Sequence, residues 1–175
     1  MKKFLLLTTA TAFSLLSLTA CGQKGDKSKR PSPPATAKQT LASGATVTID
    51  YSQPSVKGRT IGKDLEPMTG KVWRTGANEA TVFEVDKDVK VEGQALPKGK
   101  YALFTISGDN EWTIIFNKTW DQWGAFDYKE DKDALRVKVK PGKAAAFAEK
   151  MAFTVGKDGK ISLMWGDVQV DFTVQ

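Results

Sequence analysis

The end of the chain, residues 161–174 (ISLMWGDVQVDFTV), decides the fold class. Apolar residues stand at 168, 170, 172 and 174, and the residues between them, Gln169, Asp171 and Thr173, are polar. Side chains of a β-strand point alternately to opposite faces, so this period of two indicates a strand with one buried and one solvated face. Ile161, Leu163 and Trp165 repeat the spacing. One wet face is typical of antiparallel pairing.

The same alternation recurs upstream, and turn signals separate the runs. Further strands are expected within residues 46–51, 101–106, 112–116, 135–140 and 153–155. The Asp-Gly pair at residues 158–159 is a good hairpin signal. The sequence therefore predicts an all-β fold, a single antiparallel β-sandwich or jelly-roll-like domain of about eight or nine strands. The Ala-rich stretch at residues 143–150 predicts at most one short helix.

Composition excludes several classes of site. The 175 residues include no histidine and one cysteine, and 41% are hydrophobic, which suits one globular domain. Without histidine there is no Ser-His-Asp or Cys-His nucleophile and no His-ligated zinc or haem. A single cysteine excludes an intrachain disulfide. We expect no cofactor and no metal.

The N-terminus predicts a targeting segment. Lys2 and Lys3 precede an apolar run at residues 4–18, which is too short to span a bilayer comfortably. It ends in Leu-Thr-Ala-Cys at residues 18–21, which resembles the lipobox of bacterial lipoproteins. We expect residues 1–20 to be a cleaved signal peptide and Cys21 to carry lipid; the alternative is an ordinary secretory signal.

Residues 21–41 are expected to form a disordered basic tether before a domain over residues 42–175. The tether is rich in Pro, Ser and Lys, and cannot bury a core. Of the net charge of +6, two units lie in the signal peptide and four in residues 22–38, so residues 39–175 are electrically neutral. That distribution favours contact with anionic headgroups and argues against nucleic-acid binding.

The expected location is the cell envelope. Gly22, next to the cysteine, is not an acidic retention residue, so we expect the periplasmic face of the outer membrane of a Gram-negative bacterium. The partners expected there are the membrane itself and a glycan, a peptide or an envelope protein.

A long connection at residues 52–81 interrupts the strand pattern and is a candidate site, because long irregular connections are often functional. It contains Arg59, Trp73, Arg74, Asn78 and Glu79. These side chains could form a polar ligand pocket. Alternatively they form a turn network in which Arg pairs with Glu.

A second connection, at residues 117–131, concentrates aromatic side chains. Asn117, Trp120, Trp123 and Tyr128 could present a stacking platform for sugar rings. The alternative is a small core beneath the loop. The tryptophans at 112 and 165 fit strand alternation and are expected in the core.

Acidic side chains leave a hydrolase open. Two carboxylates facing each other across a cleft are the apparatus of a glycosidase, and Glu79 with Asp121 or Asp127 is the candidate pair. The spacing selects none of them. A calcium site at Asp127, Glu130 and the acids that follow lacks the order of an EF-hand loop.

Several motifs together resemble one family. They are SVKGR at 55–59, GKVWRTGANEAT at 70–81, LPxGxYxLFTI at 96–106, EWTIIFNK at 111–118, WGA at 123–125 and LRVKV at 135–139. The chain resembles the bacterial DUF2911 family over roughly residues 46–139, and differs from its usual pattern at residues 61–69. The resemblance implies a secreted or lipid-anchored bacterial β-domain and brings no established catalytic residues.

The functional expectation is therefore a lipid-anchored envelope protein that binds glycan, peptide or a partner protein without catalysis. The alternatives are a hydrolase that uses Glu79 with an Asp, and a structural subunit without a ligand pocket.

Overall fold

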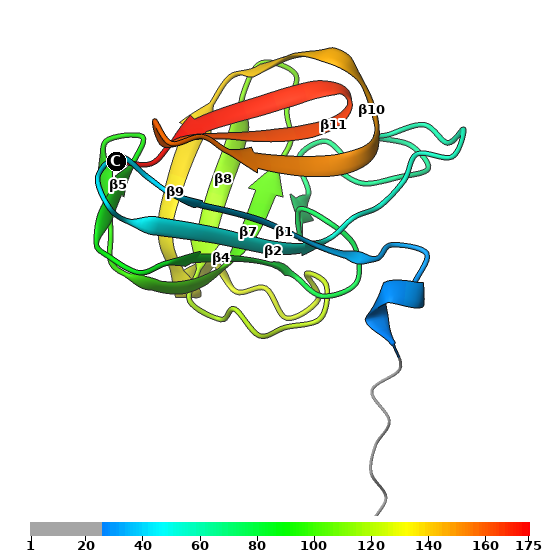
Figure 1. Cartoon of the computed structure of the whole chain (residues 1–175). Helices are drawn as coiled ribbons and strands as arrows, with labels where there is room; N and C mark the ends of the chain where they lie inside the picture. Colours follow the sequence, from blue (N-terminus) through cyan, green and yellow to red (C-terminus); the bar gives the residue numbers. More distant parts are fainter. Residues whose placement is uncertain (1–25) are drawn as a thin grey trace, which may run out of the picture.

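Buried residues alternate along the strands, and this sets the inner face of the large sheet. In β2 (Thr46–Ser52), Val47 and Ile49 are fully buried, and in β4 (Thr81–Val85) Phe83 is fully buried. The computed structural model describes residues 26–175, and they form an all-β fold (Figure 1). The expected fold class is confirmed.

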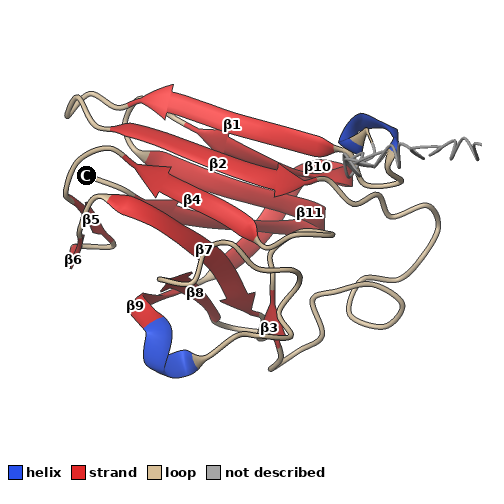
Figure 2. Cartoon of the chain, turned by 90° about the horizontal axis from the view of Figure 1, so that it is seen from below, coloured by secondary structure: helices blue, strands red, loops and turns tan. Residues whose placement is uncertain are grey.

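The large sheet is antiparallel throughout (Figure 2). Its strand order is β1-β2-β4-β7-β8-β9, and β3 pairs with the end of β7. The other strands of this sheet are β1 (Pro34–Thr40), β3 (Val72–Trp73), β7 (Gly99–Ile106), β8 (Trp112–Asn117) and β9 (Asp133–Val139).

A long hairpin of β10 (Pro141–Val155) and β11 (Lys160–Thr173) covers the inner face (Figure 1). Between the two layers lies the main core, in which aromatic rings meet edge to face, for example Phe83 and Phe116 with centroids 5.0 Å apart. The tryptophans at 112 and 165 are buried there, as expected. A small hairpin, β5 (Val89–Val91) with β6 (Gln94–Leu96), completes the fold.

A second, smaller core lies on the outer face of the sheet. Its buried members come from the outward positions of β7 and β8 and from the residue before β4: Ala80, Ala102, Phe104 and Ile115. Ala125 and Tyr128 of the aromatic connection pack against it. The connection at residues 117–131 is therefore attached to the sheet by its C-terminal part.

The prediction of a helix at residues 143–150 is wrong, because this stretch belongs to strand β10. Its alanines favour a helix locally, but two turns are marginal in isolation and pairing with β11 prevails. The register of β10 against β11 shifts twice within this run, between Lys143 and Ala148 and between Ala148 and Ala152. Residues 26–175 contain only two short 3₁₀ helices, η1 (Lys27–Lys29) and η2 (Glu130–Lys132), and no α-helix.

The prediction that residues 21–41 form a disordered tether is wrong from Lys27 onward, where η1 begins. Pro34–Thr40 form β1, which pairs with the whole of β2, from Pro34 opposite Ser52 to Thr40 opposite Thr46. Proline and lysine suit an edge strand, where an unpaired backbone faces solvent. Residues 26–175 form eleven strands rather than the expected eight or nine, because the period-two pattern does not reveal β1 and several very short strands.

Candidate functional site

A tight connection between β3 and β4 positions the polar side chains. Thr75 (φ 52°) and Asn78 (φ 58°) are left-handed, a conformation that costs energy, especially for a β-branched residue. Thr75 is fully buried, and its carbonyl accepts a 2.7 Å hydrogen bond from the hydroxyl of Thr81. This strained turn, held by its surroundings, fixes Arg74 and Glu79.

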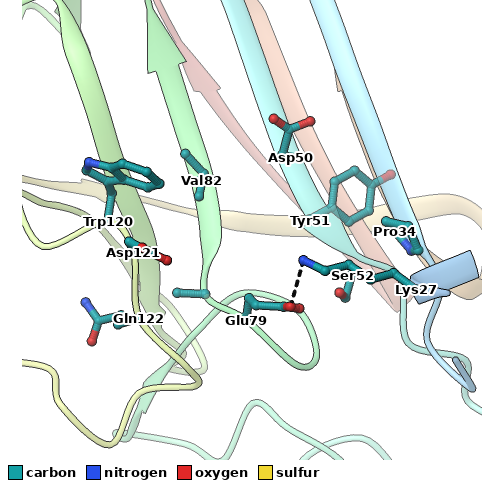
Figure 3. A pocket seen from close by; sticks show the side chains of 11 residues that line it. Lys27, Pro34, Asp50, Tyr51, Ser52, Glu79, Val82, Trp120, Asp121 and Gln122 are labelled. Carbon is teal, nitrogen blue, oxygen red and sulfur yellow. Dashed lines mark ion pairs between the residues drawn. The ribbon is translucent and has the colours of Figure 1, made fainter. Parts of the chain in front are cut away.

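The Glu79 cavity is a hollow of about 230 Å³ over the outer face of β2 and β4 (Figure 3). Asp50 and Val82, which are opposite each other in the sheet, line it together with Trp120. The full lining is Lys27, Pro34, Asp50, Tyr51, Ser52, Glu79, Ala80, Val82, Trp120, Asp121 and Gln122. Figure 3 shows Trp120, Asp121 and Gln122 on one side and Lys27 with Pro34 on the other.

The N-terminal segment, residues 27–33, binds the edge of this cavity. Lys27 Nζ lies 2.9 Å from Glu79 Oε1, and Arg30 Nη1 lies 2.8 Å from Oε2. The side-chain amide of Asn78 donates to the carbonyl of Ser32 at 3.0 Å. Residues expected in a free tether therefore hold the candidate site from outside.

These contacts keep Glu79 ionised. Burial opposes its charged form, but the hydrogen bonds from Lys27 and Arg30 outweigh burial and lower the pKa of Glu79 to about 2. The alternative in which an arginine of the 52–81 connection pairs with Glu79 is wrong, because Lys27 and Arg30, from outside that connection, form the ion pairs with Glu79.

The aromatic connection divides into an exposed part and a buried part. The exposed fractions of Trp120, Trp123 and Phe126 are 40%, 54% and 84%. The backbones of Trp123 and Glu79 form an isolated antiparallel β-bridge. The guanidinium carbon of Arg30 lies 6.0 Å from the centre of the Trp123 ring. Tyr128 instead packs edge to face on Phe104 at 5.1 Å. Tyr128 thus belongs to a small core beneath the connection, whereas the rings of Trp120 and Trp123 are exposed. A sugar-stacking role for these two rings stays a prediction.

Two of the candidate residues, Asn117 and Tyr128, have structural partners. The amide of Asn117, which is fully buried, donates to the carbonyl of Lys129 and to Asp133, and its oxygen accepts from Thr119 N–H. The Tyr128 hydroxyl donates to Asp133 at 2.7 Å. Burial and this hydrogen bond raise the pKa of Tyr128 to about 12. Both side chains fix the connection to the sheet.

Arg59, Trp73 and Arg74 line a different hollow, the Arg74 cavity, of about 340 Å³. Asp64, Glu66, Met68 and Trp165 share its wall. Trp73 is 2% exposed and donates to the carbonyl of Gly76, so it supports the turn. Five of the predicted site residues therefore divide between two cavities on either side of the 74–80 turn. The other four, Asn78, Asn117, Trp123 and Tyr128, line neither cavity.

Sequence reasoning missed Lys27, Arg30, Asp50 and Gln122. Asp50 occupies an outward position of a clearly alternating strand, and that signal could have placed it beside Val82. Lys27 and Arg30 contact Glu79 across about fifty residues of sequence, for which no local pattern exists.

The expected signal peptide (residues 1–20) and the expected lipid attachment at Cys21 lie outside the described residues. Within residues 26–175 no helix is long and apolar enough to cross a membrane. The same part of the chain holds no group of three or more His, Cys, Asp or Glu side chains arranged for a metal ion.

A protein-family model matches residues 32–174 of the sequence, and it is described as "Protein of unknown function (DUF2911)". The chain belongs to the DUF2911 family. The match begins just before β1, which agrees with the inclusion of that strand in the fold. No curated protein and no solved structure matches this DUF2911 chain.

Proposed function

We propose that this chain is a non-catalytic carbohydrate-binding module of the bacterial cell envelope, held to the membrane by lipid on Cys21. The observation that carries the proposal is the half-exposed ring of Trp120 beside the carboxylates and amide of the Glu79 cavity. Cysteine in a lipobox-like context supports the location.

The chemistry of the Glu79 cavity suits a sugar ring. An indole face offers apolar contact to the C–H side of a pyranose, and carboxylates accept strong hydrogen bonds from its hydroxyls. Asp50 and Asp121 supply such carboxylates around Trp120, and Gln122 adds a side-chain amide. A volume of about 230 Å³ is smaller than the roughly 300–1,000 Å³ of pockets for drug-sized ligands. One ring at the end of a chain fits this size.

The low pKa of Glu79 argues against one of the two carboxylate roles in a glycosidase, that of the general acid. A glycosidase needs one carboxylic acid whose pKa is raised so that it can protonate the leaving oxygen. Glu79 has the opposite shift, to about 2, and its oxygens are bonded to Lys27 and Arg30. Such a group serves as a fixed acceptor.

The binding test is tryptophan fluorescence titration of the full-length chain in detergent with soluble cell-wall glycan fragments and other envelope oligosaccharides. We expect saturable binding that Trp120→Ala weakens at least tenfold. Phe147→Ala is the matched control, because Phe147 is 53% exposed and lies outside the Glu79 cavity.

Three results would overturn the proposal. Binding of no oligosaccharide, or equal binding by the Trp120→Ala variant, removes the site. Release of new reducing ends that disappears in Glu79→Gln would instead establish a hydrolase.

The anchor is tested separately in cells that express the chain. We expect incorporation of labelled palmitate and recovery in the membrane fraction, and both are lost in Cys21→Ser. A Cys21→Ser chain that remains in the membrane would show that another segment holds it there.

A further inference from the structure

The Arg74 cavity has charges of both signs on its wall. Arg59 and Arg74 provide two positive charges, and Asp64 and Glu66 provide two negative charges. No ion pair among residues 26–175 joins any of these four side chains. Opposite charges that share one hollow without touching leave room for a group that touches both.

The arginines have donors to spare. The Nε of Arg74 is buried and has no hydrogen-bond partner in the described part of the chain. Burial lowers the pKa of Arg74, and the charge of Glu66 partly offsets that effect, so the two groups interact across the hollow. Arg59 donates from Nε to the carbonyl of Val56 and from one terminal nitrogen to Ser55, which leaves its other terminal nitrogen for a ligand.

The carboxylates are half used. Asp64 accepts the backbone N–H of Thr60 through Oδ2 at 3.0 Å, and Glu66 accepts that of Met68 through Oε2 at 2.7 Å. These bonds fix both side chains in place and leave one oxygen of each without a bond to residues 26–175. A fixed carboxylate with a spare oxygen is a good acceptor for an ammonium group.

Charge balance selects the ligand. A simple anion drawn to the arginines would lie near Asp64 and Glu66, and a simple cation drawn to the carboxylates would lie near Arg59 and Arg74. Like charges held close together disfavour both. A group that carries a carboxylate and an ammonium side by side satisfies both walls and leaves the cavity neutral.

We propose that the Arg74 cavity binds an α-amino-acid group in its zwitterionic form, with its carboxylate on Arg74 and Arg59 and its ammonium on Glu66 and Asp64. The source is a free amino acid or an unblocked amino-acid group at the end of a larger envelope molecule. This site is distinct from the Glu79 cavity, and the proposal stands without the sugar site.

Calorimetric titration of the full-length chain in detergent tests the charge requirement. The ligands are glycine, N-acetylglycine, which keeps only the carboxylate, and glycinamide, which keeps only the ammonium. We expect glycine to bind at least tenfold more tightly than either blocked form. A γ-glutamyl peptide with its α-amino and α-carboxyl groups free distinguishes the two sources: tighter binding than glycine indicates the larger molecule.

Variants place the binding in the Arg74 cavity. Arg74→Gln and Glu66→Gln are each expected to weaken glycine binding at least tenfold, while Lys138→Gln, on an exposed side chain far along β9, leaves it unchanged. Glu66→Gln retains the shape of the side chain and guards against a folding failure of the arginine variant.

Equal binding of N-acetylglycine and glycine would mean an anion site and overturn the proposal, as would no binding of glycine. Glycine binding that survives both cavity variants would place the ligand elsewhere. Trp120→Ala separates the two proposals, because this substitution should weaken sugar binding in the Glu79 cavity and leave glycine binding in the Arg74 cavity intact.

Discussion

The ion pairs between the N-terminal segment and Glu79 give a quantitative prediction. The perturbation is a double-mutant cycle of Arg30→Ala and Glu79→Gln. Arg30 is 29% exposed and Glu79 36% exposed, so the pair lies between a surface ion pair and a buried one. Exposed pairs contribute about 0.2–1 kcal/mol, and two short contacts from one nitrogen favour the upper end, about 1 kcal/mol of coupling.

The assay is thermal unfolding of the full-length chain in detergent, followed by circular dichroism at pH 7. A coupling of about 1 kcal/mol corresponds to roughly 2–4 °C in Tm for a domain of this size. Glu111→Gln serves as the control partner, because Glu111 pairs with Lys138 instead. Effects of Arg30→Ala and Glu79→Gln that add to within about 0.3 kcal/mol would refute the reasoning.

The contribution of Glu79 to stability should depend on pH in a direction that its pKa fixes. The pKa of Glu79 in the folded chain is about 2, below its ordinary value of 4.5, so its contribution is complete above about pH 4.5. It is lost as the pH falls from 4.5 through 2. Wild type should therefore exceed Glu79→Gln in stability at pH 7 and lose that advantage near pH 2. A constant difference over this window would contradict the shift.

Two further predictions concern the backbone and a tyrosine. Gly159→Ala should destabilise the fold by about 2–4 kcal/mol in denaturant titrations, because a Cβ would lie 1.9 Å from the Val174 carbonyl oxygen at φ +87°. Gly93→Ala, at φ +78° with open space, should cost only about 1 kcal/mol, and equal losses would contradict the clash. Absorbance at 295 nm should show one tyrosine that ionises near pH 12 and is missing in Tyr128→Phe. Since that pKa is raised, the stability due to Tyr128 should fall between about pH 10 and 12, and a titration unchanged by the substitution would contradict this assignment.

The fold was largely predictable, because the strands that build the core carry their own signal. Residues such as Val47, Ile49 and Phe172 alternate with polar neighbours, and burial of one face follows directly. The first part of strand β10 was missed because its alanines resemble a helix, and only its pairing with β11 makes it a strand. Strand β1 was missed because an edge strand needs few apolar residues, so its sequence, PATAKQT, lacks the alternating pattern of large apolar side chains.

The candidate site was predictable in part. Glu79 and Trp120 stood out as a polar and an aromatic residue in long connections, and they line one cavity. Arg74 stood out equally, yet the left-handed turn at Thr75 separates it from Glu79. The partners Lys27 and Arg30 come from a stretch of low complexity. These contacts join residues about fifty positions apart in the sequence, so they can be seen only in the folded chain.

The attachment of residues 27–33 to Glu79 has a mechanical consequence for an anchored protein. With lipid on Cys21, as proposed, only residues 22–25 separate the anchor from Asp26, and five Cα steps extend at most about 18 Å. The Glu79 cavity would therefore work within a thin layer next to the bilayer. A force on the lipid would load the bonds of Lys27 and Arg30 first, and would pull on the carboxylate at the edge of the cavity before it reached any strand of the sheet.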